Sequence, residues 1–125
     1  SAFSGQIDLL EGDSKSEAVH RELQTRLRGE PNVLVCLDSD HTRAHTLEEL
    51  RLFSRYVPVG GYMVLFDTIC EDLADTPNGD PAWVHDSPMA ALRQFLAESP
   101  NFASDPAWGK FLVTFAPQGF LVRQS

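Results

Sequence analysis

Residues 33–41 read Val-Leu-Val-Cys-Leu-Asp-Ser-Asp-His, an apolar run that ends in a polar tip. A second run of this kind, Tyr-Met-Val-Leu-Phe-Asp-Thr, occupies residues 62–68 after a Gly-Gly pair. Continuous apolar runs of this length, bounded by turn residues, are typical of strands that are covered on both faces of a parallel sheet. The two runs therefore predict neighbouring buried strands. We expect residues 33–37 to form a central strand of the sheet.

Helical patterns alternate with these strands, which indicates an α/β fold with a parallel sheet. Residues 14–17, Ser-Lys-Ser-Glu, match a capping box and precede apolar residues spaced four apart, so they predict a first helix. A second helix is expected from about Thr42 to Tyr56. Ser87 and Pro88 suit the cap and the first turn of a third helix.

Three further segments complete the expected architecture. Residues 7–11 predict a short first strand that Gly12 stops. Residues 71–88 are polar and rich in Pro, Gly and Asp, and this stretch is long enough to be a candidate lid or binding loop. Residues 111–115 and 120–122 flank the turn signal Ala-Pro-Gln-Gly, so we expect them to pair as an antiparallel hairpin.

The composition is that of one ordinary globular domain. The chain has 125 residues, with 10 Lys and Arg against 18 Asp and Glu, a formal net charge of −8. A domain of this size can bury enough surface to need no disulfide or metal for its core. The negative balance disfavours nucleic acid and anionic membranes as partners. The two cysteines form no disulfide framework, and the N-terminus lacks a secretory pattern, so we expect a cytoplasmic protein.

The polar tips of the two buried strands carry the candidate chemistry. Ligands of open α/β sheets collect beyond the carboxyl ends of the strands, and neighbouring strands lie about 4.8 Å apart. Asp40 and Asp67 are therefore predicted to hold Mg²⁺ or Ca²⁺, with waters and substrate oxygens completing the coordination. The alternative is that the acids after the strand only cap the next helix, as Asp38 or Asp40 would do for the helix near Thr42.

Other polar residues near these tips have less distinctive patterns. His41 is a candidate acid/base or substrate contact, and Arg43 could meet an anionic group, while His45 is expected on the solvated helix surface. Residues 11–14, Glu-Gly-Asp-Ser, either offer a carboxylate and backbone N–H groups to the ring edge of a ligand or cap the first helix. The sequence has no Gly-x-Gly-x-x-Gly and no phosphate-binding Gly-Lys-Ser/Thr motif.

Taken in order, these segments resemble the cephalosporin hydroxylase/rhamnosyl O-methyltransferase family, which has the class I methyltransferase fold. The likeness covers almost the whole chain, and the combination of LDSDH with APxGFLxR is fairly specific. The stretches that carry it are IDLLEGDS (7–14), VLVCLDSDH (33–41), HTLEELRLFSRY (45–56), VPVGGYMVLFDT (57–68), AALRQFL (90–96) and TFAPQGFLVR (114–123).

The resemblance implies a Rossmann-like, methyltransferase-type sheet that is mostly parallel and ends in an antiparallel hairpin. It also implies S-adenosylmethionine as cofactor, Mg²⁺ near the transferred methyl group, and a small hydroxylated molecule as substrate. By this likeness Asp40 and Asp67 are the metal carboxylates and His41 and Arg43 the catalytic residues. Glu11, Asp13, Ser14 and Asp38 are expected to bind the cofactor.

The sequence departs from the family pattern in two ways. Phe66 stands where the family often has a second acid directly before the aspartate. The first two strands of the family, with the Gly-rich turn, are expected before Ser1, so residues 1–125 form a single partial domain. Their removal leaves a gap in the sheet, which predicts a homo-oligomer or strand exchange and impaired cofactor binding. A non-catalytic α/β binding or regulatory module is the alternative function.

Overall fold

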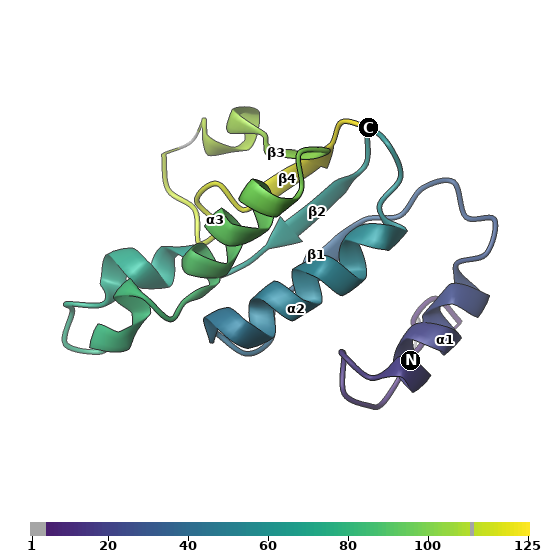
Figure 1. The fold of residues 1–125 in the computed structure, drawn as a ribbon, viewed down its shortest axis with the longest axis horizontal. Coiled ribbons are helices and arrows are strands. Elements are labelled where there is room, and N and C mark those ends of the chain that lie inside the picture. The colour runs from purple at the N-terminus through teal and green to yellow at the C-terminus, as the bar shows by residue number, and fades with distance from the viewer. Residues whose placement is uncertain (1–4, 111) are drawn as a thin grey trace.

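Four short strands form one open sheet in the computed structural model, which describes residues 5–110 and 112–125 (Figure 1). The strands lie in the order β1-β2-β4-β3, with β1 parallel to β2 and with β4 antiparallel to both of its neighbours. It follows that β1, β2 and β3 run in the same direction, so their carboxyl ends share one edge of the sheet. The bounds are β1 (Val35–Leu37), β2 (Tyr62–Leu65), β3 (Phe102–Ser104) and β4 (Phe120–Arg123).

Two long helices lie side by side along the sheet, and a third lies at the far end of the molecule from β3 and β4 (Figure 1). Within the described residues no helix is both long enough and apolar enough to cross a bilayer. The α-helices are α1 (Glu17–Arg26), α2 (Arg43–Phe53) and α3 (Pro88–Glu98). Four 3-10 helices connect them to the strands: η1 (Ser54–Tyr56), η2 (Thr68–Leu73), η3 (Pro81–Val84) and η4 (Pro106–Gly109).

The core lies between the sheet and the pair α2 and α3. Strand residues alternate between the two faces of a sheet, and Met63 pairs with both Val35 and Leu121 on the face toward the core. Leu50 of α2 and Phe95 of α3 are fully buried against this face. Burial of these side chains stabilises the fold, since truncating one large core residue typically costs about 2–5 kcal/mol.

The structure confirms the three predicted helices. Ser87 caps α3 because its hydroxyl accepts the N–H of Ala90, as the Ser-Pro pair predicts. The cap of α1 is Ser16, whose hydroxyl accepts the N–H of Val19, and not the first serine of the capping-box pattern. The predicted loop at residues 71–88 includes η3 and the second half of η2, and Glu71 ties it to Arg93 of α3.

The predicted strand at residues 7–11 is wrong. Ile7 and Leu9 have no strand pairing and are 61% and 89% exposed. Asp8 instead contacts Arg26 of α1 at 3.5 Å. A strand is stable only when a neighbour satisfies its backbone hydrogen bonds, and the described sheet offers this segment no such neighbour.

The prediction of a central strand at residues 33–37 is also wrong. β1 is an edge strand, and it begins only at Val35. Leu34 is 64% exposed and Cys36 is exposed, so the second face of the strand is not covered. A continuous apolar run indicates where burial is favourable, but it cannot tell which other segment supplies the cover.

The prediction of a terminal hairpin is correct for its second strand, residues 120–122, which lie in β4. It is wrong for the first strand, residues 111–115, which was expected to pair with it. β4 pairs with β2 and β3, whereas residues 112–115 form no strand and residue 111 lies outside the described residues. The observed partner, β3, is the short stretch Phe-Ala-Ser, which has no apolar run that would mark it as a strand. The described sheet is mixed and not mostly parallel in its pairing, because β1 and β2 pair in parallel whereas both pairings of β4 are antiparallel.

Candidate functional site

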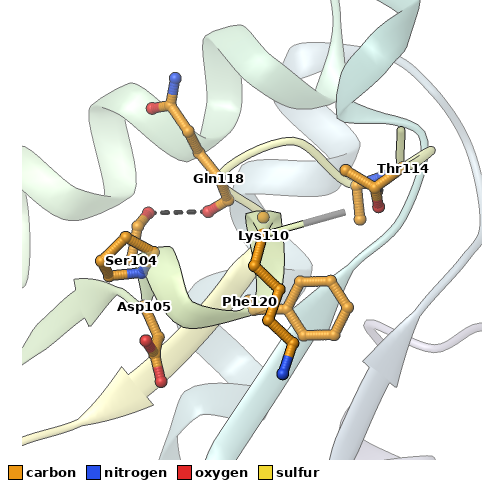
Figure 2. A pocket seen from close by; sticks show the side chains of 9 residues that line it. Ser104, Asp105, Lys110, Thr114, Gln118 and Phe120 are labelled. Atoms are coloured by element: carbon orange, nitrogen blue, oxygen red, sulfur yellow. Dashed lines mark hydrogen bonds between the residues drawn. The ribbon is translucent and has the colours of Figure 1, made fainter. Parts of the chain in front are cut away.

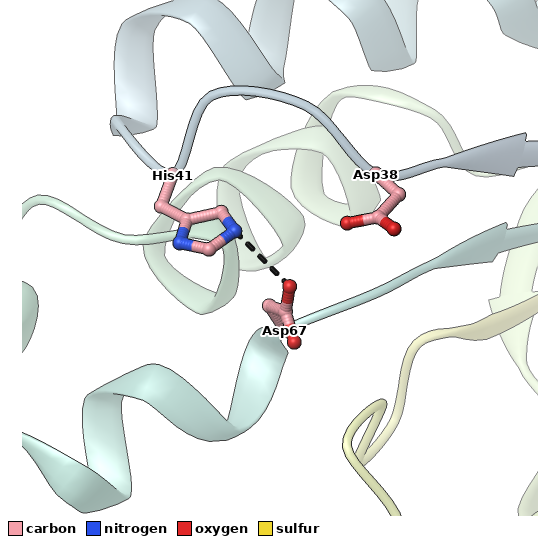
Figure 3. Close-up of side chains that lie close together, drawn as sticks. All are labelled: Asp38, His41 and Asp67. Carbon is pink, nitrogen blue, oxygen red and sulfur yellow. Dashed lines mark ion pairs between the residues drawn. The ribbon is translucent and has the colours of Figure 1, made fainter.

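Three polar side chains meet at the carboxyl edge of β1 and β2 (Figure 3). Asp38 follows β1 directly, His41 lies three residues further on, and Asp67 stands between β2 and η2. The Nε2 atom of His41 is 3.0 Å from Oδ2 of Asp67, and one ligand atom from each of the three residues lies within 4.8 Å of the others. We call these three residues the edge cluster.

The backbone of Asp67 explains how its side chain reaches the edge cluster. Asp67 has the left-handed conformation, with φ 57° and ψ 23°, and it joins the extended β2 to η2. Aspartate and asparagine tolerate this conformation better than other non-glycine residues, whereas a β-branched side chain there is strained. The next residue, Thr68, is fully buried, and its hydroxyl donates to the carbonyl of Pro117 at 2.8 Å. The turn at Asp67 is therefore held by β2 before it and by the buried Thr68 after it.

Asp40 makes local hydrogen bonds at the turn that leads into α2. Its Oδ1 accepts the backbone N–H of Thr42 at 2.7 Å, and its own carbonyl accepts the hydroxyl of Thr46. The hydrogen bonds from Thr42 hold the pKa of the Asp40 carboxyl below its usual value. The carboxylate thus closes the turn before α2, whose N-cap is Thr42 and has no side-chain cap hydrogen bond. Among the described residues, the structure brings Asp38 and His41 to Asp67 as a possible ligand set.

Arg43 is engaged outside the edge cluster. Its guanidinium donates to the side-chain oxygen of Gln94 on α3 at 2.7 Å, and its backbone N–H donates to Asp86 at 2.6 Å. These contacts tie the first turn of α2 to α3 and to the loop before it. A catalytic role for Arg43 therefore has no support from its contacts.

A buried glutamate, Glu49, links the turn before α1 to the tip of β1. It was not among the residues predicted from the sequence. Glu49 of α2 is 3% exposed and accepts hydrogen bonds from the hydroxyls of Ser14 at 2.6 Å and Ser39 at 2.5 Å. Nε2 of His45 is shielded from solvent and lies 3.3 Å from Oε1 of Glu49, without the alignment of a hydrogen bond. The prediction that His45 lies on the solvated helix surface is therefore wrong. His45 lies four residues before Glu49 and so on the same face of the helix. This spacing is the sequence signal that could have pointed to Glu49.

The turn before α1 is thereby placed beside the tip of β1. Ser14 reaches Ser39 through Glu49, and Ser39 is the neighbour of Asp38. Asp13 shapes this turn, since its carboxylate accepts the N–H of Lys15 at 2.9 Å. Glu11 is exposed in the segment that precedes the turn. Of the four predicted cofactor residues, the structure joins Ser14 to the neighbourhood of Asp38, whereas Asp13 serves the turn itself.

Cys70 borders the edge cluster from the buried side. Its Sγ lies 4.0 Å from Nδ1 of His41, and burial raises the pKa of the thiol. Cys70 is therefore a neutral thiol near pH 7 and no candidate nucleophile. The other ring nitrogen of His41, Nε2, faces the carboxylate of Asp67. The edge cluster consequently offers two carboxylates and one imidazole nitrogen to whatever binds there.

Such a set suits two kinds of chemistry. Carboxylate oxygens are the ligands of hard divalent cations, and an imidazole ligand extends the range to Mn²⁺, Fe²⁺ and Zn²⁺. An imidazole held by a carboxylate is also a common proton acceptor in group-transfer reactions.

Comparison with known proteins gives the family of this chain. The model of the rhamnosyl O-methyltransferase/CmcI family matches residues 1–124, and the chain belongs to this family. The rhamnosyl O-methyltransferase of Mycobacterium tuberculosis is 31% identical over 118 residues, which cover 91% of this chain and 46% of that protein. The protein of the same name from Mycobacterium leprae is 30% identical over 124 residues, which cover 94% of this chain and 51% of that protein.

The chain thus spans about half the length of the curated relatives that it matches. No solved structure gives a significant match to it.

Proposed function

We propose that this chain contributes the acceptor and cation side of an S-adenosylmethionine-dependent O-methyltransferase with a Rossmann-like sheet. The proposed substrate is a small hydroxylated molecule, and the name of the relatives, rhamnosyl O-methyltransferase, suggests a rhamnosyl group. The convergence of Asp38, His41 and Asp67 at the carboxyl edge of the sheet carries this proposal, because ligands of open α/β sheets bind there. Membership of an O-methyltransferase family supports the reaction type.

A divalent cation fits the donor set of the edge cluster. Asp38 and Asp67 would hold it, and Mg²⁺ is the first candidate because both ligands are carboxylates. A bound cation lowers the pKa of a coordinated hydroxyl, which makes the oxygen a better nucleophile at neutral pH. Phe66 offers no further ligand atom, so waters and the substrate would have to supply the remaining positions.

The residues of the chain would then prepare the acceptor hydroxyl. A hydroxyl that enters between Nε2 of His41 and Asp67 would replace their 3.0 Å contact, and Nε2 would then be free to take its proton. S-adenosylmethionine, when bound, would supply the methyl group, whose bond to the donor sulfur would break as its bond to the hydroxyl oxygen forms. Alignment of the oxygen with the methyl donor supplies much of the rate of such transfers.

S-adenosylmethionine is proposed to lie near the turn at residues 11–14. The support is the link from Ser14 through Glu49 to Ser39, which sets this turn beside Asp38. Residues 1–125 lack a Gly-x-Gly-x-x-Gly motif, so we expect this chain alone to bind the cofactor weakly. Calorimetric titration with S-adenosylmethionine, with and without Mg²⁺, tests this. Micromolar binding by residues 1–125 would refute the impairment.

Cation binding tests the edge cluster directly. We expect titration with Mg²⁺ or Mn²⁺, followed by calorimetry and by paramagnetic broadening of amide signals, to locate the ion beside Asp38 and Asp67. Asp38→Asn and Asp67→Asn should each weaken binding about tenfold or more, which corresponds to about 1.4 kcal/mol. The broadening should be strongest at residues 38–41 and 66–68.

Asp40→Asn is the matched control, because the side-chain oxygen of asparagine can accept the backbone N–H two residues on as that of aspartate does. Its cation affinity should stay within about twofold of the parent chain, since its carboxylate already serves Thr42. The opposite result, in which Asp40→Asn abolishes binding and Asp38→Asn does not, would restore the ligand pair predicted from the spacing. Absence of any cation binding at the edge cluster would remove the cation from the proposal.

The open edge of β1 supports the expectation of an oligomer or strand exchange. Leu37 of β1 accepts the N–H of Phe66, so the alternate residue Cys36 directs its backbone groups to the opposite side of the strand. Sedimentation at several protein concentrations measures association. A monomer at all concentrations would contradict it.

A further inference from the structure

A pocket of about 320 Å³ lies between the start of β4, the end of β3 and the loop at residues 114–118 (Figure 2). This volume is at the lower end of the range for small-molecule sites. It mixes one aromatic ring with several polar side chains, and the mechanism proposed above uses none of them. The labelled side chains that line it are Ser104, Asp105, Lys110, Thr114, Gln118 and Phe120.

The aromatic side of the pocket is fixed in place. The ring of Phe120 stacks on that of Trp108, with centroids 5.7 Å apart and an interplanar angle of 21°. Trp108 in turn meets Tyr62 edge to face, with centroids 6.2 Å apart. Because Phe120 stacks on Trp108 with one face, its other face can offer an apolar surface on which the C–H face of a ligand ring can pack.

The carboxylate of Asp105 is the best-ordered polar group in the pocket. Its Oδ2 accepts the hydroxyl of Tyr62 at 2.5 Å, and its Oδ1 accepts the N–H of Ala107 at 2.9 Å. These two bonds lower the pKa of Asp105, so the group is ionised at neutral pH. A carboxylate has about four acceptor positions, and these two bonds use one on each oxygen. Asp105 can therefore accept hydroxyl groups from a ligand, whereas it repels an anion.

The loop that lines the pocket is hydrogen-bonded to the residues of η2 that directly follow Asp67 of the edge cluster. Thr68, directly after Asp67, donates to Pro117, and the N–H of Ile69 approaches the carbonyl of Phe115 at 3.4 Å. Both acceptors belong to the loop that lines the pocket. In the sheet β4 lies between β2 and β3, so the pocket begins about one to two strand spacings, roughly 5–10 Å, from the end of β2.

We propose that this pocket binds a neutral sugar ring and is the acceptor subsite of the enzyme. The inference rests on the proposed function, to which it adds the place of the acceptor and the residues that contact it. A pyranose offers hydroxyl donors to Asp105 and a C–H face to Phe120. A ring bound there extends along the sheet edge toward Asp67, which is where its reacting hydroxyl has to be.

The test titrates residues 1–125 with methyl α-L-rhamnopyranoside and follows the amide signals by NMR. We expect saturable shifts at Gly109, Thr114 and Gln118 and at the indole of Trp108. Asp105→Asn and Thr114→Val should each weaken binding about fivefold to tenfold, the equivalent of one hydrogen bond. Asp75→Asn, at an exposed aspartate outside this pocket, is the matched control and should leave the affinity unchanged.

Cyclohexanol serves as a second probe, because it keeps the ring size and only one hydroxyl. Binding of cyclohexanol at least as tight as that of the sugar would overturn the proposal, since the pocket would then select apolar rings. Absence of sugar-dependent shifts at the pocket would overturn it as well. Sugar-dependent shifts confined to residues 38–41 and 66–68 would overturn the subsite and leave the proposed function intact. Cation binding in the same samples tests the proposed function separately.

Discussion

The imidazole of His41 and the carboxylate of Asp67 meet at 3.0 Å, although each belongs to the tip of a different strand. Two local features bring them together. Asp40 accepts the N–H of Thr42 and so holds the turn that carries His41. The left-handed backbone of Asp67 turns its side chain toward the same place. The pairing therefore depends on backbone geometry as much as on charge.

Two variants of Asp67 can separate the effect of its backbone conformation on stability from the effect of its charge. We expect Asp67→Asn to keep the free energy of unfolding within about 0.5 kcal/mol, because asparagine tolerates the left-handed conformation. Asp67→Val should lower it by about 1–2 kcal/mol, the cost of this conformation for a β-branched residue. Urea unfolding followed by circular dichroism measures both. Equal losses for the two variants would show that the charge, not the backbone, sets the stability at this position.

Glu49 is expected to matter far more to stability than its neighbour in sequence. Glu49→Ala should lower the free energy of unfolding by about 1–3 kcal/mol, because the hydroxyls of Ser14 and Ser39 lose their buried acceptor. Glu48, more than half exposed and 3.5 Å from Lys15, is the control. Glu48→Ala should change the value by less than about 0.5 kcal/mol. Similar effects of the two variants in urea unfolding would argue against a structural role for the buried carboxylate.

Gly119 lies where the loop before β4 crosses β2. A Cβ there would lie 2.2 Å from the carbonyl oxygen of Leu65, and the carbonyl of Gly119 accepts the N–H of the same Leu65. Gly119→Ala is therefore expected to cost more than about 2 kcal/mol of stability, since the backbone must move. Gly109→Ala, with nothing within 4 Å, is the control and should be close to neutral. A lowered melting temperature for Gly109→Ala alone would contradict this.

The contact between α2 and α3 should depend on pH. Arg51, with help from Gln94, holds the pKa of Glu98 below its usual value. A lowered pKa in the folded state adds stability above the unfolded value, about 4.3, and this gain disappears as the pH falls through the folded pKa. We expect Arg51→Met to raise the pKa of Glu98 toward the unfolded value and to make stability less dependent on pH below about 5.

Titration of the Glu98 side-chain carboxyl by ¹³C NMR measures this shift. Arg28→Met, at an exposed arginine near the end of α1, is the control and should leave the Glu98 titration unchanged. An unchanged pKa in Arg51→Met would mean that Gln94 alone is responsible.

The sequence predicts the helices of this fold better than its strands. Caps are local, so Ser87 and Pro88 mark the start of α3 correctly. Strand pairing is not local: β3 has only three residues, and whether residues 7–11 form a strand depends on a neighbour elsewhere in the chain. Patterns in the sequence report the preference of a segment, whereas a sheet needs the preferences of two segments to agree.

The same distinction explains the outcome at the site. Strand ends with acidic residues indicate the carboxyl edge, and Asp67 and His41 do lie together there. Spacing alone does not distinguish Asp38 from Asp40, because that choice depends on which carboxylate accepts the N–H of Thr42. Glu49 was not predicted, since a Glu-Glu pair on a helix usually faces solvent and its two serine partners come from distant segments.

The hydrogen bond from Thr68 to Pro117 makes the two proposed ligands thermodynamically interdependent. One end of this bond follows Asp67, and the other belongs to the loop that lines the sugar pocket. If binding of the cation or of the sugar shifts this hydrogen bond, it also changes the binding free energy of the other ligand. By linkage, whatever factor the cation adds to the affinity for the sugar, the sugar adds to the affinity for the cation.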